Sequence, residues 1–372
     1  MNRVFLIAGR TGGPFFPLPA VVNNLHNIQP ICIGIRGGFE EHAAKTKGWK
    51  IEYLPDTRLT IFSFKREKLR ETIKNYLELA LNIFLLVWSF VKSLYLLVRF
   101  NPKMIYSTGS FLAVPMVLAA KVTNSVGFTN TKIVVHQQDP LPGLSNRLTI
   151  DFADLASCVF DYTKSRYTKF SQVLQIPNPI DAEIYTDLSI SKNIKNPELK
   201  KFLTAKSELP LLLIFGGGSG SEDINVWTLK NIKGLLKKFR IIHLIGVLQK
   251  KELDDVEHAG YLRLDALFEE MPAVMNASDV VLCRAGMASI TELLYLQKPA
   301  YLVPLPSTHQ EQNAEMVKDQ FYILDQKDRP NWLQTISDSY PSYFKSVVYP
   351  DKQKTTQQLA DYYQKLQSLL DN

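Results

Sequence analysis

The chain has 372 residues, of which 46% are hydrophobic and 21% are charged, and its formal net charge is +7. This composition excludes a disordered chain, and the length favours two domains over a single core. The three cysteines are widely spaced and match no CxxC or other metal-ligand spacing, so we expect no bound metal and a reducing cytoplasm. The positive charge favours anionic partners such as nucleotides or acidic lipid, while no nucleic-acid module pattern is present.

The first half of the chain alternates short apolar runs with helical patterns. The first run is too short for a signal peptide and glycines follow it at once, so we expect a buried strand there. The expected strands are 4–8, 31–35, 104–107, 133–136 and 156–160, and the expected helices are 17–24, 65–100 and 111–123. This alternation predicts a parallel sheet with helices on both faces.

The expected helix at 65–100 contains the most apolar stretch of the chain. Its residues 79–91 form a run of 13 without a charge, fewer than the roughly 20 that a membrane-spanning helix needs. We therefore expect no transmembrane helix. Basic residues precede the run, and apolar residues cover most of its circumference, which favours shallow docking on anionic lipid through Phe84, Leu85 and Trp88. The alternative is a helix buried in the core.

A second domain follows a linker in which two prolines flank an asparagine, at residues 176–180. Strands are then expected at 211–215, 241–245, 280–283 and 300–303, and helices at 226–237, 268–276, 289–296 and 312–318. An amphipathic helix at 352–370 ends the chain. We expect an N-terminal domain at 1–178, a C-terminal domain at 179–351, and the last helix packing back on the first domain.

Two glycine-rich loops follow expected strands, at residues 9–14 (GRTGGP) and 215–221 (FGGGSGS). Glycines let the backbone approach a ligand closely, and a helix that starts after such a loop points N–H groups at an anion. The second loop is typical of phosphate contact, although it lacks the P-loop pattern. Both loops can also be read as plain strand-to-helix turns.

The segment CRAGMASITE, residues 283–292, leads from a strand into a helix expected near Ser289. The free N–H groups of Ala288 and Ser289 would then lie at the positive end of that helix. Glu292 has two interpretations. It can complete a capping box with Ser289, which the spacing alone slightly favours, or it can accept hydrogen bonds from two ribose hydroxyls.

Polar residues follow two further strands. Gln310 and Asn313 are neutral, directional hydrogen-bonders that suit sugar hydroxyls, although a merely solvated loop has the same composition. His136 and Asp139 stand at the end of the strand 133–136, where open α/β sheets bind ligands, and either residue could act as a general base. The alternative there is an Asx turn of Asp139 before Pro140.

Taken in order, these motifs resemble the GT-B glycosyltransferases of the MurG type, over about residues 3–320. That family transfers N-acetylglucosamine from UDP-GlcNAc to undecaprenyl-pyrophosphate-linked muramyl peptide and so makes lipid II. The segments that carry the resemblance are AGRTGGPFFPLPA, GSFLAVPMVLAA, HQQDPLPGLSN, GGGSGSEDIN, CRAGMASITE, and VPLP followed by HQEQNA. The CRAGMASITE and HQEQNA segments are the most specific.

The resemblance implies a role for each matched residue. The backbone of Phe268 would read the uracil, Glu292 would bind the ribose, and Gln310 would contact the donor sugar. Ala288 and Ser289 would hold the diphosphate. The complete implied donor site is Gly217, Gly218, Ser219, Phe268, Arg284, Ala288, Ser289, Glu292, Gln310 and Asn313, and the implied acceptor and phosphate loop is Thr11, Gly12, Gly13, Gly109 and Ser110.

Three positions depart from the family pattern. Pro14 replaces a histidine, and Gln137 and Asp139 stand where the family has glutamate and asparagine. An acid is thus lost at one position and gained two residues later. We hypothesise that Asp139 is the general base, with His136 in support. Two alternatives remain: positioning and diphosphate stabilisation supply most of the catalysis, or the chain has lost activity.

The resemblance implies a GT-B fold, in which two Rossmann-like parallel-sheet domains face across a cleft. It also implies inverting transfer without a metal or other cofactor, UDP-GlcNAc being the donor substrate. The protein would act in peptidoglycan synthesis, and so in cell shape and division, as a peripheral protein on the cytoplasmic face of the cell membrane. The alternatives are a UDP-sugar transferase for another lipid acceptor such as diacylglycerol, and a non-catalytic UDP-sugar-binding membrane protein.

Overall fold

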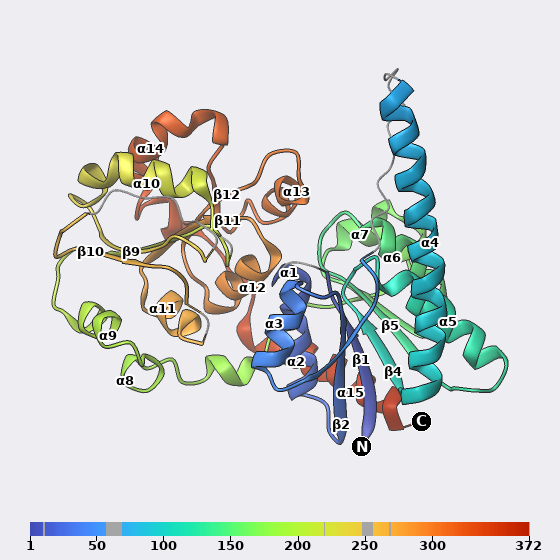
Figure 1. Ribbon diagram of the computed structural model, residues 1–372. Helices are drawn as coiled ribbons and strands as arrows, with labels where there is room; N and C mark the ends of the chain where they lie inside the picture. Colours follow the sequence, from blue (N-terminus) through green and yellow to red (C-terminus); the bar gives the residue numbers. More distant parts are fainter. Residues whose placement is uncertain (10–11, 57–68, 219, 248–255, 268, 372) are drawn as a thin grey trace. The chain divides into compact units, whose positions relative to one another are not determined.

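The computed structural model describes residues 1–9, 12–56, 69–218, 220–247, 256–267 and 269–371. The chain forms two compact units (Figure 1). Unit 1 comprises Met1–Ile180 and Gln358–Asn372, and unit 2 comprises Asp181–Gln357. The chain therefore passes from one unit to the other twice.

Unit 1 is built on a seven-stranded parallel sheet with the order β3-β2-β1-β4-β5-β6-β7. Its central strands consist largely of buried apolar residues, because helices cover both faces of the sheet. The strands are β1 (Asn2–Ile7), β2 (Ile28–Gly34), β3 (Lys50–Tyr53), β4 (Met104–Ser107), β5 (Lys132–Gln137), β6 (Leu155–Cys158) and β7 (Leu174–Gln175).

Successive residues of a strand in unit 1 point to opposite faces of the sheet, so their side chains enter two different cores. Ile105 of β4 faces a cluster that includes Leu97 of α4 (Leu69–Phe100) and Met116 of α5 (Ala113–Ser125). The next residue, Tyr106, faces α15 (Lys352–Asp371), where the hydroxyl of Tyr362 donates to the hydroxyl of Tyr106 at 3.3 Å. The other helices of this unit are α1 (Gly12–Phe15), α2 (Pro17–Asn23), α3 (Phe39–Thr46), α6 (Leu144–Thr149) and α7 (Asp161–Arg166).

Unit 2 repeats the design with a six-stranded parallel sheet in the order β10-β9-β8-β11-β12-β13. The strands are β8 (Leu211–Phe215), β9 (Arg240–Leu244), β10 (Tyr261–Leu264), β11 (Val280–Arg284), β12 (Ala300–Val303) and β13 (Tyr322–Ile323). The helices are α8 (Ile190–Asn193), α9 (Pro197–Thr204), α10 (Glu222–Leu235), α11 (Met271–Ala277), α12 (Met287–Leu296), α13 (His309–Met316) and α14 (Trp332–Ser339). Two parallel-sheet α/β units are what the predicted fold class requires.

Candidate functional site

The loop between β8 and α10 is the glycine-rich segment of unit 2, and its backbone conformation requires glycine. Gly217 and Gly220 have φ angles of 90° and 85°, which residues with a side chain rarely adopt. A Cβ atom on Gly216 would lie 2.3 Å from the Cβ of Ser221. A Cβ atom on Gly218, by contrast, would meet no described atom within 4 Å. The loop therefore exposes its backbone beside the start of α10.

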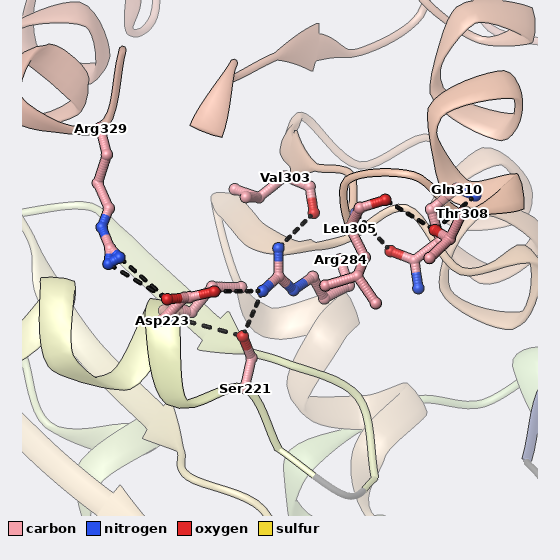
Figure 2. A network of polar contacts seen from close by, with 9 residues as sticks. Ser221, Asp223, Arg284, Val303, Leu305, Thr308, Gln310 and Arg329 are labelled. Carbon is pink, nitrogen blue, oxygen red and sulfur yellow. Dashed lines mark hydrogen bonds and ion pairs between the residues drawn. The ribbon is translucent and has the colours of Figure 1, made fainter. Parts of the chain in front are cut away.

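Arg284, the last residue of β11, lies buried at the base of this loop (Figure 2). Its guanidinium donates to the Ser221 hydroxyl at 2.8 Å and to the Val303 carbonyl at 3.3 Å, and it pairs with the Asp223 carboxylate at 3.4 Å. Arg329 donates to the same carboxylate at 3.0 Å. Arg284 thus joins β11, β12 and the first turn of α10. Its predicted contact with the donor stays a prediction.

The first turn of α12 presents unbonded backbone N–H groups. Gly286 is the N-cap and offers no side-chain hydrogen bond, and the first intrahelical bond runs from the Ile290 nitrogen to the Gly286 oxygen at 3.0 Å. The N–H groups of Met287, Ala288 and Ser289 therefore have no acceptor inside the helix. Of the two interpretations of Glu292, the capping box with Ser289 is wrong, because the helix starts two residues before Ser289 and Gly286 occupies the cap position.

Glu292, one turn further along α12, accepts a hydrogen bond from the Tyr185 hydroxyl at 2.8 Å. Tyr185 ends the 3₁₀ helix η3 (Ala182–Tyr185) and is buried. Burial raises the pKa of Glu292 to about 7, and the bond from Tyr185 acts in the opposite direction. Glu292 is therefore a half-buried carboxylate fixed by a tyrosine, not a helix-capping residue.

The loop after β12 places Gln310 and Asn313 differently. The Gln310 side-chain oxygen accepts from the Leu305 backbone nitrogen at 3.1 Å, and Thr308 caps α13 (Figure 2). The described residues offer no acceptor for the Gln310 amide nitrogen. Asn313 is fully buried and donates to the Ala285 carbonyl at 3.2 Å, so it fixes α13 to the loop before α12. The predicted contact of Asn313 with the donor substrate, too, stays a prediction.

Three predicted site residues, Thr11, Ser219 and Phe268, lie outside the described residues. The segment next to Phe268 is nevertheless anchored. One oxygen of the Glu270 carboxylate accepts from the backbone nitrogens of Lys195 and Asn196, at 2.6 Å and 2.9 Å. The described neighbours of Phe268 are thereby connected to the segment between α8 and α9.

In unit 1, the loops after β1 and β4 lie against each other. A Cβ atom on Gly9 would lie 3.2 Å from Pro14 and 3.5 Å from the Gly109 oxygen, and the Thr108 hydroxyl donates to the Pro14 carbonyl at 2.6 Å. Gly109 has a φ angle of 104°. Of the acceptor-loop residues that the structure describes, Gly12 and Gly13 begin the short helix α1, and Gly109 and Ser110 lie in the loop after β4.

His136, one of the two candidate bases, is fully buried near the end of β5. Its two ring nitrogens lie 2.9 Å from the Ser157 hydroxyl and 3.0 Å from the Asn178 side-chain oxygen. Ser157 in turn contacts the Tyr362 hydroxyl of α15 at 3.1 Å. Burial lowers the pKa of His136 to about 4, so the ring is neutral. These contacts give His136 the task of joining β5, β6 and α15.

Asp139, the other candidate base, is half-buried in a loop that Gln137 supports. The Gln137 amide nitrogen donates to the carbonyls of Asp139 at 2.7 Å and Leu141 at 3.3 Å. Its amide oxygen accepts from Asn146 at 2.7 Å. Gln137 therefore holds the backbone of the loop that carries Asp139.

Helix α4 differs from the expectation for the membrane segment. Residues Leu79–Phe100 are long and apolar enough to cross a membrane, because the helix continues through Lys92. Its last turns belong to the core of unit 1, where Leu97 is fully buried. The N-terminal end of α4 extends beyond the neighbouring helices of unit 1 (Figure 1). In the middle of the helix, Phe84 and Trp88 are 63% and 52% exposed and Leu85 is half-buried.

Among the residues that the structure describes, no group of three or more His, Cys, Asp or Glu side chains could hold a metal ion. The candidate site in unit 2 is thus a set of backbone N–H groups, one carboxylate and one amide. These groups gather at the carboxyl edge of β8, β11 and β12, which are neighbours in the sheet.

Comparison with known families assigns the chain. The N-terminal domain of glycosyltransferase family 28 matches residues 4–157, and the C-terminal domain of that family matches residues 211–341. The chain belongs to glycosyltransferase family 28. A similar family 28 protein from Clostridium botulinum (strain Alaska E43 / Type E3) is 31% identical over 87% of this chain and 84% of its own length. One from Caldanaerobacter subterraneus is 25% identical over 88% and 87%.

Both relatives are named as UDP-N-acetylglucosamine–N-acetylmuramyl-(pentapeptide) pyrophosphoryl-undecaprenol N-acetylglucosamine transferases. Solved structures agree on the fold. The chain resembles Acinetobacter baumannii MurG with a TM-score of 0.68 and 19% identity, over 98% of this chain and all of that one. It resembles the calicheamicin glycosyltransferase CalG4 with a TM-score of 0.67 and 11% identity, over 100% and 99%. The predicted GT-B fold and the family are therefore confirmed.

Sequence reasoning missed two features of this family 28 site. Tyr185 stands in no motif, and its bond to Glu292 joins residues 107 positions apart, so no local pattern could reveal it. The Asp223–Arg329 pair is equally distant in sequence. Ser221 had a local signal, since a serine before an acidic first turn is typical of an N-cap.

Proposed function

We propose that this family 28 protein transfers N-acetylglucosamine from UDP-GlcNAc to an undecaprenyl-pyrophosphate-linked muramyl peptide, converting lipid I into lipid II in peptidoglycan synthesis. The observation that carries the proposal is the open N-terminus of α12 followed one turn later by Glu292. A diphosphate and a ribose need these two features in this order. The names of the curated relatives support this donor and this acceptor.

Within this proposal, unit 2 binds the donor. The N–H groups of Ala288 and Ser289 hold the diphosphate, and the positive end of the α12 dipole stabilises its charge. Glu292 accepts from the ribose, and the Gln310 amide nitrogen donates to a hydroxyl of the sugar. The glycine-rich loop with Gly217 and Gly218 supplies further backbone donors.

The chemistry is an inverting displacement. The acceptor hydroxyl attacks C1 of the sugar, the bond from C1 to the diphosphate oxygen breaks, and UDP leaves. Negative charge develops on that leaving oxygen, so N–H groups fixed at a helix N-terminus stabilise the transition state more than the bound donor. No step requires a metal or other cofactor.

Asp139 of unit 1 is the residue we propose to take the proton of the acceptor hydroxyl. Its support is the acid gained at 139 together with the loop held by Gln137. His136 is not proposed to share in proton transfer, since both its nitrogens have partners in the interior. Turnover by Asp139→Asn within about threefold of the wild type would contradict this role and favour catalysis by positioning alone.

The test of the whole function is incubation with radiolabelled UDP-GlcNAc and lipid I. The expected result is a radiolabelled lipid II product. Transfer to diacylglycerol or another lipid would overturn the proposed acceptor, and UDP binding without turnover would overturn the proposed activity. Uridine, UDP and dTDP serve as competitors that report the donor class.

For the membrane, we propose that the protein binds the cytoplasmic membrane surface from outside the bilayer through the middle of α4, which carries Phe84, Leu85 and Trp88. The large exposed apolar side chains of this part support shallow insertion, whereas the buried residues of the last turns, Leu96 and Leu97, keep the helix attached to unit 1. The exposed apolar residues of α4 are Leu81, Ile83, Phe84, Val87, Trp88, Val91, Tyr95 and Val98.

Vesicle co-sedimentation tests this surface. Changing Phe84 and Leu85 to Ser and Trp88 to Gln should release the folded protein from anionic liposomes. The matched control changes exposed apolar residues of unit 2, Leu209→Gln and Val348→Ser, and should leave binding unaltered. Undiminished binding of the α4 variant, with its circular dichroism spectrum unchanged, would contradict the proposal.

A further inference from the structure

We propose that Tyr185 is a positioning residue for nucleotide recognition: its hydroxyl fixes the Glu292 carboxylate in the orientation that accepts hydrogen bonds from a ribose diol. This inference rests on the proposed function, because it assumes that Glu292 binds the ribose. It assigns a task to a residue outside all the motifs of the chain.

The bond leaves Glu292 with the capacity that a diol needs. The hydroxyl of Tyr185 occupies one position on Oε1, at 2.8 Å. An ionised carboxylate has about four acceptor positions on its two oxygens, so about three remain. No ion pair involves Glu292 among the described residues. A glutamate side chain has three rotatable bonds, and this single hydrogen bond fixes the carboxylate at its end.

Tyr185 can do this because its own ring is buried and packs against a second tyrosine. The ring is 6% exposed and packs edge-on against Tyr295, with the ring centres 5.4 Å apart. The Tyr295 hydroxyl contacts that of Thr356 at 3.3 Å, and the Lys352 ammonium lies 4.7 Å from the centre of the Tyr295 ring. The hydroxyl that reaches Glu292 is therefore positioned by packing that does not involve Glu292.

The same bond affects the protonation of Glu292. Of the groups that face this carboxyl, Tyr185 lies on η3 and the Cys283 thiol lies on β11, and burial raises the pKa of Cys283. Asp181 and Tyr295 act on Tyr185 itself. Burial opposes ionisation of Glu292, while the bond from Tyr185 favours it. A carboxylate that must accept two hydrogen bonds works best ionised, so UDP should bind more tightly as the pH rises through about 7.

The test is the variant Tyr185→Phe, which keeps the ring and removes only the hydroxyl. Calorimetric titration with UDP and with 2′-deoxy-UDP, between pH 6 and 9, measures its effect. We expect UDP to bind about tenfold more weakly, as loss of a hydrogen bond to a charged group implies. We expect a smaller loss for 2′-deoxy-UDP, and a binding midpoint shifted to higher pH because the ionised form has lost a donor.

The matched control is Tyr301→Phe, which removes another buried tyrosine hydroxyl of unit 2, one that contacts Ser339 at 2.7 Å. It should lower the melting temperature and leave the ratio of UDP to 2′-deoxy-UDP affinity unchanged. In the background Glu292→Gln, Tyr185→Phe should add nothing to the loss of UDP affinity, because the two residues act through one contact.

The outcomes separate two failures. If the wild-type protein binds UDP and discriminates against 2′-deoxy-UDP, but Tyr185→Phe keeps the same ratio and the same pH midpoint, the positioning role is overturned and the donor assignment stands. If the wild-type protein binds UDP no better than uridine, the proposed function fails and this inference fails with it.

Discussion

At position 137, a neutral amide has a task that a carboxylate could not perform. Gln137 donates to the carbonyls of Asp139 and Leu141 and accepts from Asn146, so it uses both ends of its amide group. A glutamate there would place an oxygen against two carbonyl oxygens. The amide of Gln137 therefore supports the loop that carries the acid of Asp139.

Gln137→Glu should lower kcat for lipid II formation by about tenfold, because the loop of Asp139 loses two donors and gains a repulsive charge. UDP affinity should not change, since the donor groups lie in unit 2. Steady-state kinetics and UDP titration measure the two effects. A variant with kcat within about threefold of the wild type would show that the support from Gln137 is dispensable.

Glu292 should also affect stability in the nucleotide-free protein. Its folded-state pKa of about 7 exceeds its ordinary value of 4.5, so the folded state holds the proton more tightly between these pH values. Stability should thus fall as the pH rises from about 4.5 to 7. Relative to Glu292→Gln, the wild type should lose up to about 3 kcal/mol over this range. Urea unfolding at pH 5 and pH 7 tests this, and parallel profiles for the two proteins would contradict it.

At the scale of elements, α12 combines two demands on its first turn. Gly286 caps the helix without a side chain, so the free N–H groups remain available to a ligand. A capping side chain would stabilise the helix but would use one of these donors. Helix α12 therefore lacks the stabilisation that a capping side chain would give, and in return its first turn stays available to an anion.

The substitution Ala288→Asp should separate the stability of α12 from its affinity for an anion. A carboxylate in the first turn favours the helix dipole by about 0.5 kcal/mol, so the melting temperature should stay equal or rise. The same charge should repel a diphosphate and weaken UDP binding by tenfold or more, while uridine, which has no phosphate, should bind as before. Equal losses for UDP and uridine would place the diphosphate elsewhere.

The glycine-rich loop supplies a matched pair of substitutions. Gly216→Ala places a Cβ atom 2.3 Å from that of Ser221, so we expect a loss of about 1–3 kcal/mol in unfolding free energy. Gly218→Ala enters open space and should leave stability unchanged. Thermal unfolding of both variants checks the difference, and equal melting temperatures would refute this account of the loop.

The sequence predicted elements where burial is complete and missed them where it is partial. Strands β4, β8 and β12 were predicted with the observed bounds, because both faces of each strand are covered and every residue is apolar or small. Strand β3 (KIEY) and strand β13 (YI) lie at sheet edges: charged residues interrupt the apolar pattern of β3, and β13 has only two residues. Tyr185 could not be predicted, because only the tertiary fold brings it to Glu292.

At the scale of the whole molecule, the two units have separate interiors. Phe5, Ile105 and Leu97 belong to one cluster in unit 1, whereas Trp227 and Trp332 belong to another in unit 2, where their rings pack at 5.3 Å. Each unit thus contains the apolar core needed for a cooperative transition of its own.

UDP should therefore raise the melting temperature of one unit more than that of the other. A ligand that binds only the folded form of unit 2 stabilises that unit by about 2.7 kcal/mol at a hundredfold excess over its dissociation constant. Differential scanning calorimetry with and without UDP should show one transition moving. Leu97→Ala, in the core of unit 1, should lower the other transition. Equal shifts of both transitions by UDP would mean that the units unfold together.

The two passages of the chain between the units have a consequence for biosynthesis. Unit 2 is one uninterrupted stretch, whereas the last helix of unit 1 follows unit 2 in the chain, and its Tyr362 contacts Tyr106 in a sheet whose strands all precede unit 2. Asn2 contacts the Leu370 carbonyl at 3.5 Å, so both ends of the chain meet in unit 1 (Figure 1). We therefore expect unit 2 to be able to fold before α15 has been made, and unit 1 to complete its folding only once α15 is available. A nascent chain truncated before residue 352 should have a protease-resistant second half and a first half still open to cleavage.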